Sequence, residues 1–239
     1  MGKPTRTFRY FNNSILNSSK LKVLDLYCCS GLAAEGMLRN DVIVVGVDIK
    51  HPSYYPGHLL MADVLELPID FVRMFDFVAA SPPCQAFSIA SAVPLSKGYS
   101  YPNLIPATRE LLIESGVPGY IENVPQAPIR NDLMLCGSMF NLNVRRHRVF
   151  ELVNWFCLTS PQLCNHPSKG GVIDTVAGSF KGSIHKVAES MGCYPTRLRD
   201  EIKEGIPPAY SDYILKHFIA QQPTAKLHSV FPLSFSFVK

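Results

Sequence analysis

Short apolar runs recur along the first two thirds of the chain. Each has the length of a buried strand, and helical patterns separate most of them. The runs cover residues 21–27, 42–48, 59–62, 75–80, 119–124 and 148–152. Strands that are apolar throughout and alternate with helices are typical of a parallel sheet covered on both faces. The pattern therefore predicts an α/β fold, with one helix ending near residue 38 and another over residues 103–115.

The pattern changes after residue 152. Between residues 153 and about 184, regular elements are interrupted by Pro161, Pro167, Gly170, Gly171 and Gly178. Helical patterns then return over residues 185–191, 197–203 and 208–220, followed by a stretch to residue 239 that could be a strand or a frayed tail. We expect three parts, with a main domain over 1–152, a small irregular lobe over 153–204, and a helix and tail over 205–239.

The composition suits a globular protein. Hydrophobic residues make up 47% and charged residues 18% of the 239 positions, and the net charge is +4. This mild basic bias is compatible with a polyanionic partner but does not require one. No apolar run is long enough to span a membrane, and the N-terminus does not resemble a secretion signal. We expect a cytoplasmic protein, most simply a monomer.

Seven cysteines give no disulfide framework, because their number is odd and their spacings form no compact pattern. Reduced thiols are the simplest interpretation, and Cys28, Cys29, Cys136 and Cys193 are expected to be structural. Cys157, Cys164 and His166 could belong to a zinc site. Their spacing is not a standard one and no second Cys-x-x-Cys pair completes it, so we expect no metal.

Acidic residues end three of the expected strands. Asp25 precedes a tight turn at Ser30-Gly31, which alone could be an ordinary strand-to-helix turn. Asp48 follows 23 positions later, where an acid can hydrogen-bond a ribose diol. Asp63 is placed to accept a hydrogen bond from the amine of adenine. No phosphate-binding loop occurs, so the pattern favours an adenosine without phosphates, such as S-adenosylmethionine.

Chemistry-bearing residues follow two further strands. Cys84 comes directly after Pro82-Pro83, a stiff pair that presents the next side chain in one place. Glu122 lies at an apolar strand end, where burial should raise its pKa. A basic cluster, Arg145-Arg146-His147-Arg148, can orient an acid, a base edge or a phosphate.

These motifs resemble those of the cytosine-C5 DNA methyltransferases. The resemblance rests on Ser81-Pro82-Pro83-Cys84-Gln85, Glu122-Asn123-Val124 and Arg146-His147-Arg148, covers roughly residues 21–152, and is weaker near Gly205–Tyr210. It implies a Rossmann-like S-adenosylmethionine-dependent methyltransferase fold with a small target-recognition lobe, as in the short phage and bacterial members. Double-stranded DNA is the implied partner and S-adenosylmethionine the implied cofactor.

The resemblance also implies roles for individual residues. Cys84 would attack C6 of a flipped cytosine, Glu122 would contact N3 and the amine, and Arg148 with Arg146 would hold both in place. The implied cofactor residues are Asp25, Tyr27, Ser30, Gly31, Asp48, Ile49, Asp63, Val64 and Pro82. The candidates for DNA contact are Gln85, Ser88, Arg145, Lys169, Lys181, His185, Arg197 and Arg199.

The chain departs from the family's pattern at four positions. Cys29 and Leu32 stand where the turn usually has glycine, and Val144 stands where the family usually has glutamine. Ile206 replaces the asparagine of a late Gly-Asn motif. A lobe this small can project few side chains into the major groove, so we expect a recognition site of about 2 to 4 base pairs.

Three alternatives remain open at this point. An RNA cytosine-C5 methyltransferase would use the same chemistry, since some relatives act on tRNA. A DNA-binding relative without catalysis would need neither Cys84 nor Glu122, so the presence of both residues argues against it. An unrelated thiol enzyme would need a partner for Cys84 and would leave the three acids unexplained.

Overall fold

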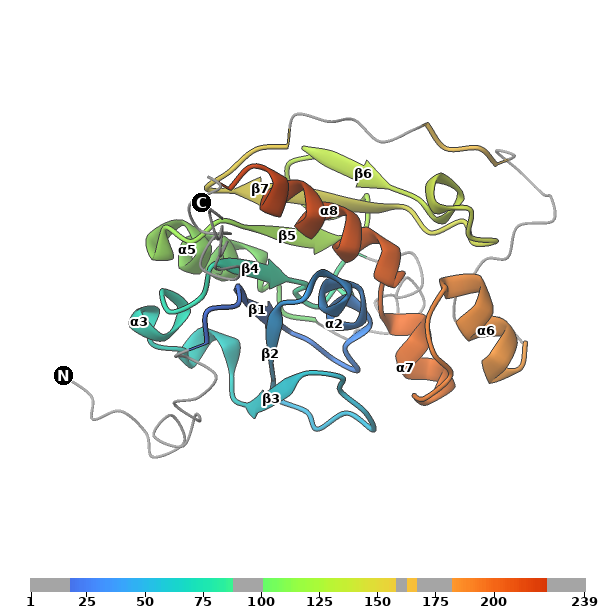
Figure 1. Cartoon of the computed structure of the whole chain (residues 1–239), viewed down its shortest axis with the longest axis horizontal. Coiled ribbons are helices and arrows are strands. Elements are labelled where there is room, and N and C mark those ends of the chain that lie inside the picture. The colour runs from blue at the N-terminus through green and yellow to red at the C-terminus, as the bar shows by residue number, and fades with distance from the viewer. Residues whose placement is uncertain (1–17, 88–100, 158–162, 167–181, 223–239) are drawn as a thin grey trace, which may run out of the picture.

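The computed structural model describes residues 18–87, 101–157, 163–166 and 182–222, and these form one sheet with helices on both faces (Figure 1). The strands are β1 (Lys22–Leu26), β2 (Ile43–Asp48), β3 (His58–Met61), β4 (Phe77–Ala80), β5 (Gly119–Asn123), β6 (Leu133–Leu135) and β7 (Arg148–Val153). The α/β prediction is confirmed, and each of the six expected strands is present. The pattern missed β6, because its three residues are too few to show one.

The strand order is β3-β2-β1-β4-β5-β7-β6. Strands β1 to β5 are parallel, whereas β7 runs antiparallel to both β5 and β6. In chain order, β2 and β3 are added on one side of β1, and β4 and β5 are then added on its other side. The point of reversal lies between β1 and β4, and ligands of open α/β sheets bind outside the carboxyl ends of the strands at such a point.

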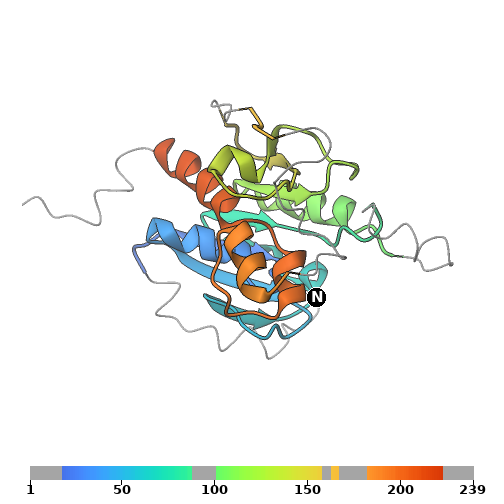
Figure 2. The ribbon, with the colours of Figure 1, turned by 90° about the vertical axis from the view of Figure 1, so that its right-hand side faces the viewer.

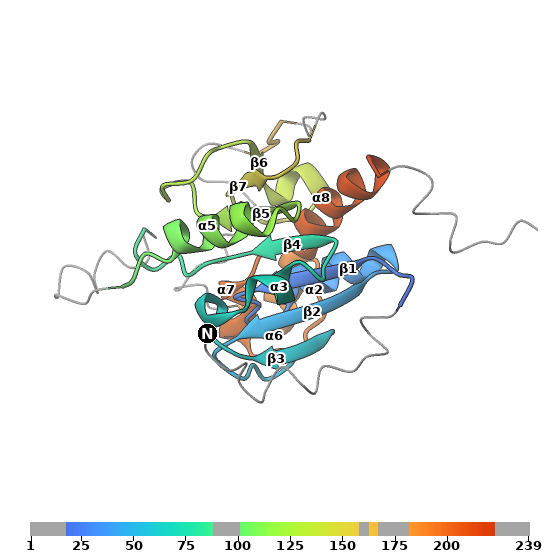
Figure 3. The same ribbon diagram turned by 90° about the vertical axis from the view of Figure 1, so that its left-hand side faces the viewer.

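Helices cover both faces of the sheet. On one face, α2 (Leu32–Met37) packs on α8 (Pro208–Ala220), and α8 buries Tyr210, Ile214 and Phe218 against the sheet. On the other face lie α3 (Ile69–Val72) and α5 (Ile105–Ser115), which Figure 3 shows in front of the strands. Strands covered on both sides must be apolar throughout, which is why β1, β2 and β4 read as continuous apolar runs.

Two short helices, α6 (Ile184–Met191) and α7 (Arg199–Glu204), stand at the end of the sheet to which the parallel strands point (Figures 1 and 2). The sequence pattern started α7 at residue 197, but the structure starts it at Arg199 because Leu198 is its cap. There the Glu201 side chain accepts a hydrogen bond from the Leu198 backbone N–H at 3.0 Å. Likewise α5 begins at Ile105, whose N–H donates to Asn103 Oδ1.

Three short 3-10 helices complete the described elements. They are η2 (Leu38–Asn40), η3 (Val64–Glu66) and η5 (Gly137–Phe140). Much of the expected lobe, and the tail from residue 223, lie outside the described residues, so the three-part division of the chain stays a prediction. Within the part of the chain that the structure describes, no helix is long and apolar enough to cross a membrane.

Candidate active site

A cavity of about 1580 Å³ opens at the carboxyl ends of the strands, at the point where the sheet order reverses. It brings together residues that the sequence placed in two separate groups. All four expected catalytic residues line it, namely Cys84, Glu122, Arg146 and Arg148. All nine expected cofactor residues line it as well, namely Asp25, Tyr27, Ser30, Gly31, Asp48, Ile49, Asp63, Val64 and Pro82.

The loop that carries Cys84 is tied to both neighbouring strands. Ser81 N–H donates to Leu26 O at 3.1 Å, which joins the end of β4 to the end of β1. Asn123 Nδ2 donates to Pro82 O at 2.9 Å, which joins the loop to β5. Cys84 itself is half-buried and packs on Ile105 and Val124. The thiol is therefore held at one place in the cavity before any ligand arrives.

Glu122 and Arg148 form an ion pair at the floor of the cavity. Arg148 Nε lies 3.0 Å from Glu122 Oε1, and both side chains are largely buried. Burial raises the pKa of Glu122, against the opposing effect of Arg148, Arg146 and a hydrogen bond from Ser81. The expected rise in the pKa of this carboxyl is confirmed. Glu122 can consequently hold a proton more readily than an exposed glutamate.

The pKa of the Cys84 thiol depends on the charges of Glu122 and the two arginines. Burial raises the pKa of its thiol, and the nearby Glu122 raises it further, whereas Arg148 and Arg146 lower it. The balance favours the thiol over the thiolate. Protonation of Glu122 would shift that balance toward the thiolate, so proton uptake by Glu122 favours proton loss from Cys84.

Arg146 belongs to the site's framework. It is buried, and burial together with nearby Arg148 lowers its pKa to about 9. Its Nη2 donates to Lys203 O at 2.5 Å, and its carbonyl accepts from Tyr210 Oη at 2.6 Å. Arg146 thus joins the end of α7 and the start of α8 to the strands that carry the expected catalytic residues.

The turn after β1 adopts an unusual backbone. Tyr27, Cys29 and Gly31 all have positive φ, of 58°, 45° and 72°. A Cβ at Gly31 would lie 2.5 Å from Pro56 Cδ and 2.6 Å from Tyr55 Cδ2, so only glycine fits there. Cys29 occupies a position that glycine would adopt without strain, and its half-buried side chain lines the cavity, facing Glu204 Oε2 at 3.7 Å.

The three acids surround this turn in different ways. Asp48 accepts from the N–H groups of Cys29 and Lys50, each at 2.9 Å, so its carboxylate is fixed at the cavity wall. Asp63 is exposed and accepts from Leu65 N–H. Asp25 is almost fully buried and accepts from Tyr55 Oη at 3.0 Å. The carboxylates of all three acids line the cavity and can accept hydrogen bonds. Because the sequence has no phosphate-binding loop, these acceptors fit the adenosine part of S-adenosylmethionine.

The position of Arg197 contradicts one prediction from the sequence. We expected a DNA contact, but its side chain is fully buried, pairs with Glu35 Oε2 at 2.7 Å and donates to Ser30 O at 2.6 Å. Its Nη2 also donates to Gly31 O. Because every described contact of this guanidinium lies inside the protein, Arg197 ties the Ser30-Gly31 turn to the loop before α7 and cannot reach DNA from this position.

Two departures from the family's pattern have a packing explanation. Leu32 and Val144 are buried together with the apolar face of α6 and with Ile202 of α7. Leu32 also lies against Gly205, where an added Cβ would come within 3.0 Å. The side chains that replace glycine and glutamine therefore attach the two short helices to the sheet. This coupling explains why apolar residues suit both positions.

The remaining candidates for DNA contact are spread out. Gln85 is exposed and Arg145 is half-buried, and both line the cavity. Arg199 and His185 are exposed but lie outside its lining. Their roles stay predictions. Three further candidates lie outside the described residues, namely Ser88, Lys169 and Lys181.

Sequence reasoning missed two features near the site. Asn123 and Tyr55 were given no role, although one holds the Cys84 loop and the other hydrogen-bonds Asp25. It also missed a group of possible metal ligands, because it paired Cys157 with Cys164 and His166. The structure instead gathers Cys136, His147, Cys164 and His166.

Of the comparisons with known proteins, only the one with solved structures found a match. No protein-family model matches the sequence, and no curated protein matches it. The solved structure of S. pombe Dnmt2 methyltransferase matches 84% of this chain and 99% of its own, with 12% identity and a TM-score of 0.57. The chain thus has the Rossmann-like fold of a methyltransferase.

Other solved structures are less similar. A mutant of Spodoptera frugiperda DNMT2 is 18% identical over 68% of this chain, with a TM-score of 0.46. The Entamoeba histolytica methyltransferase EhMeth is 13% identical over 63%, with a TM-score of 0.43. The chain spans only 60% and 58% of the lengths of these two chains.

Proposed function

We propose that this chain transfers a methyl group from S-adenosylmethionine to C5 of cytosine in double-stranded DNA. The observation that carries the proposal is the meeting of Cys84, Glu122 and Arg148 in one cavity with the strand-end acids. The sequence motifs around these three residues resemble those of cytosine-C5 methyltransferases, and the methyltransferase fold supports the class of reaction.

The cofactor half of the cavity suits the proposed cofactor. Asp48 is oriented by two backbone N–H groups, as an acceptor for a ribose diol should be. Gly31 has no side chain, which lets the turn that lines the cavity pack directly against Pro56 and Tyr55. When bound, S-adenosylmethionine supplies an electrophilic methyl group on its sulfonium.

The catalytic half supplies the remaining chemistry. A stacked cytosine hides its C6, so the base must leave the helix before Cys84 can reach it. The thiol proton passes to water as Sγ bonds to C6, and Glu122 holds a proton at N3 as charge develops on the ring. The addition makes C5 nucleophilic. After methylation, loss of the C5 proton re-forms the ring double bond and breaks the bond between Sγ and C6.

Arg148 orients these groups. Its guanidinium pairs with Glu122 and lowers the pKa of Cys84, so one cation serves both the acid and the nucleophile. Asn123 donates a hydrogen bond to Pro82 O in the loop that carries Cys84. Because Asn123 is adjacent to Glu122 on β5, this bond holds the loop at a fixed position relative to Glu122. Arg148 and Asn123 both act as positioning residues for the proposed reaction.

Methyl transfer to unmethylated bacterial DNA tests the proposal, because such DNA contains every short sequence. The product nucleosides are separated and identified by mass spectrometry, with tRNA and single-stranded DNA as parallel substrates. We expect 5-methylcytosine in duplex DNA, its loss in Cys84→Ala, and its retention in Cys157→Ala. Methylation confined to RNA would overturn the proposed substrate, and methylation of a ring amine or no methylation would overturn the chemistry.

A further inference from the structure

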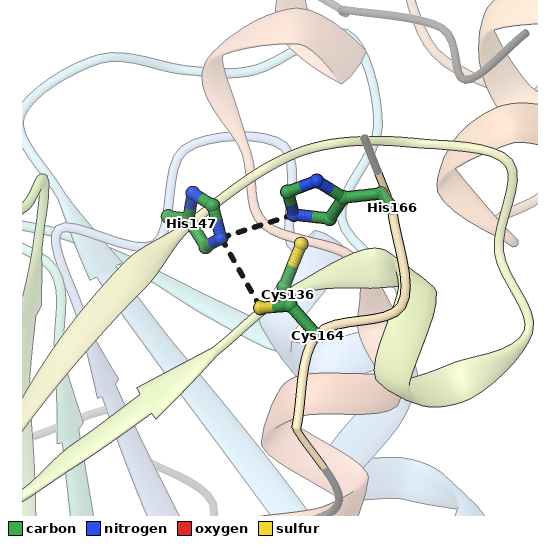
Figure 4. A group of neighbouring side chains, drawn as sticks. All are labelled: Cys136, His147, Cys164 and His166. Atoms are coloured by element: carbon green, nitrogen blue, oxygen red, sulfur yellow. Dashed lines mark hydrogen bonds between the residues drawn. The ribbon is translucent and has the colours of Figure 1, made fainter. Parts of the chain in front are cut away.

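Four side chains with metal-binding atoms converge beside the basic motif (Figure 4). Cys136 follows β6 and His147 immediately precedes β7, so both lie next to the ends of paired strands. Cys164 and His166 come from the segment 163–166, which arrives from the region of the expected lobe. One ligand atom from each of the four lies within 4.8 Å of those of all the others.

The separations between the ligand atoms suit one small ion. His147 Nε2 lies 3.3 Å from Cys164 Sγ and 3.3 Å from His166 Nε2. In a tetrahedral zinc site, bonds of about 2.0–2.1 Å to nitrogen and about 2.3 Å to sulfur place neighbouring ligand atoms roughly 3.3–3.8 Å apart. The four side chains thus need little movement to surround an ion.

The donor set identifies the metal. Two thiolates and two imidazoles in a tetrahedral arrangement select zinc among the common divalent ions, whereas calcium and magnesium prefer oxygen ligands. Two thiolates also neutralise the two charges of the ion. A neutral site suits this place, because Cys136 is fully buried.

We propose that Cys136, His147, Cys164 and His166 bind a structural Zn²⁺. Four protein ligands close the coordination sphere and leave no position for water, so the ion has no part in catalysis. It joins residues 163–166 to the ends of β6 and β7, and Asn165 N–H already donates to Ser138 Oγ of η5 at 3.2 Å. The ion also fixes the start of β7, because His147 stands between Arg146 and Arg148.

Two simpler arrangements compete with the metal. Hydrogen bonds alone could link His147 to Cys164 and to His166, and a disulfide could join Cys136 to Cys164. Pairwise hydrogen bonds do not require all four donors to face one point. A disulfide would leave the two facing imidazoles without a common partner. Both arrangements predict a chain that purifies without zinc.

Metal analysis of the purified full-length chain tests the site. The chain is expressed with zinc in the medium, purified without chelators, and measured by plasma mass spectrometry. We expect about one zinc per chain, and zinc retention against a competing chelator weakened about tenfold or more in Cys164→Ser and His166→Ala. Cys157→Ser is the matched control, because Cys157 precedes this segment in the sequence but is not one of the four, and this variant should keep its zinc.

Cobalt substitution tests the same site without any variant. The unaltered chain is stripped of metal, titrated with Co²⁺ and followed by absorption. The bands of tetrahedral cobalt with thiolate ligands, displaced by one equivalent of zinc, support the site even if the variants fail to fold. Octahedral bands, no binding of either metal, or a Cys136–Cys164 disulfide found by peptide mapping would overturn it.

Discussion

Arg148 Nε lies 3.0 Å from Glu122 Oε1, and this pair joins the start of β7 to the end of β5. The two residues are not direct partners in the sheet, since Glu122 pairs with Phe150. The ion pair therefore crosses the antiparallel strands diagonally, at the carboxyl end of β5. Its position beside Cys84 makes the reactivity of that thiol depend on charges from two strands.

Glu122→Gln should make Cys84 ionise at lower pH. The negative charge of Glu122 raises the pKa of the thiol, so its removal stabilises the thiolate. The rate of Cys84 alkylation, followed by peptide mass spectrometry across pH, should rise at lower pH than in the unaltered chain. Asp63→Asn removes the same charge from the exposed end of β3 and should leave the profile in place. A shift to higher pH in Glu122→Gln would contradict the electrostatic account.

Arg197→Ala should destabilise the fold strongly. Removing the guanidinium leaves Glu35 buried without its partner, which typically costs about 3–5 kcal/mol. Arg199→Ala, two positions later, removes an exposed arginine and should change the free energy of unfolding by no more than about 0.5 kcal/mol. Urea denaturation measures both. Equal effects of the two substitutions would return Arg197 to the surface role first expected.

Gly31→Ala and Gly116→Ala separate steric contact from backbone strain. Both glycines have φ near +70°, at 72° and 71°, so each alanine should cost about 1–2 kcal/mol in strain. A Cβ at Gly116 meets nothing within 4 Å, whereas at Gly31 it meets Pro56 and Tyr55. Denaturation should show a further loss of about 1–3 kcal/mol at Gly31 alone. Equal losses would mean that the turn has room for a side chain.

Asp25 should make the free energy of unfolding fall as pH rises. Burial raises its pKa from 3.8 to about 7, with Tyr55 lowering it and Asp48 raising it. Between these values the folded chain keeps a proton that the unfolded chain releases, so stability is full below about pH 4 and is lost as pH rises through about 7. Asp25→Asn should remove up to about 4 kcal/mol of this decline. Parallel pH profiles of the two proteins would show that Asp25 titrates normally.

Much of the fold could be predicted because buried parallel strands leave a clear trace in the sequence. β1, β2 and β4 are mostly apolar on both faces, and their parallel arrangement brings Asp25, Asp48 and Ala80 to the same end of the sheet. The antiparallel placement of β7 left no such trace, because its residues read like those of any buried strand. The candidate site could be predicted because its residues lie at or just after strand ends. Which of these residues lie close together then depends only on the order of the strands in the sheet.

Other features depend on contacts between distant segments. An arginine in a loop is usually exposed, and Arg197 is buried only because the loop before α7 folds onto α2. The four possible zinc ligands have no regular spacing, since two lie beside strands and two arrive from another region. No local pattern could have grouped them. Their convergence is a property of the tertiary structure.

Covalent trapping tests the central claim most directly. DNA that contains 5-fluorocytosine blocks the final elimination, because fluorine replaces the C5 proton that must leave. With S-adenosylmethionine present, we predict a stable adduct between this DNA and the chain, located at Cys84 by peptide mass spectrometry and absent in Cys84→Ala. No adduct with fluorinated DNA or RNA, or an adduct that persists in Cys84→Ala, would contradict the assignment of Cys84 as the nucleophile.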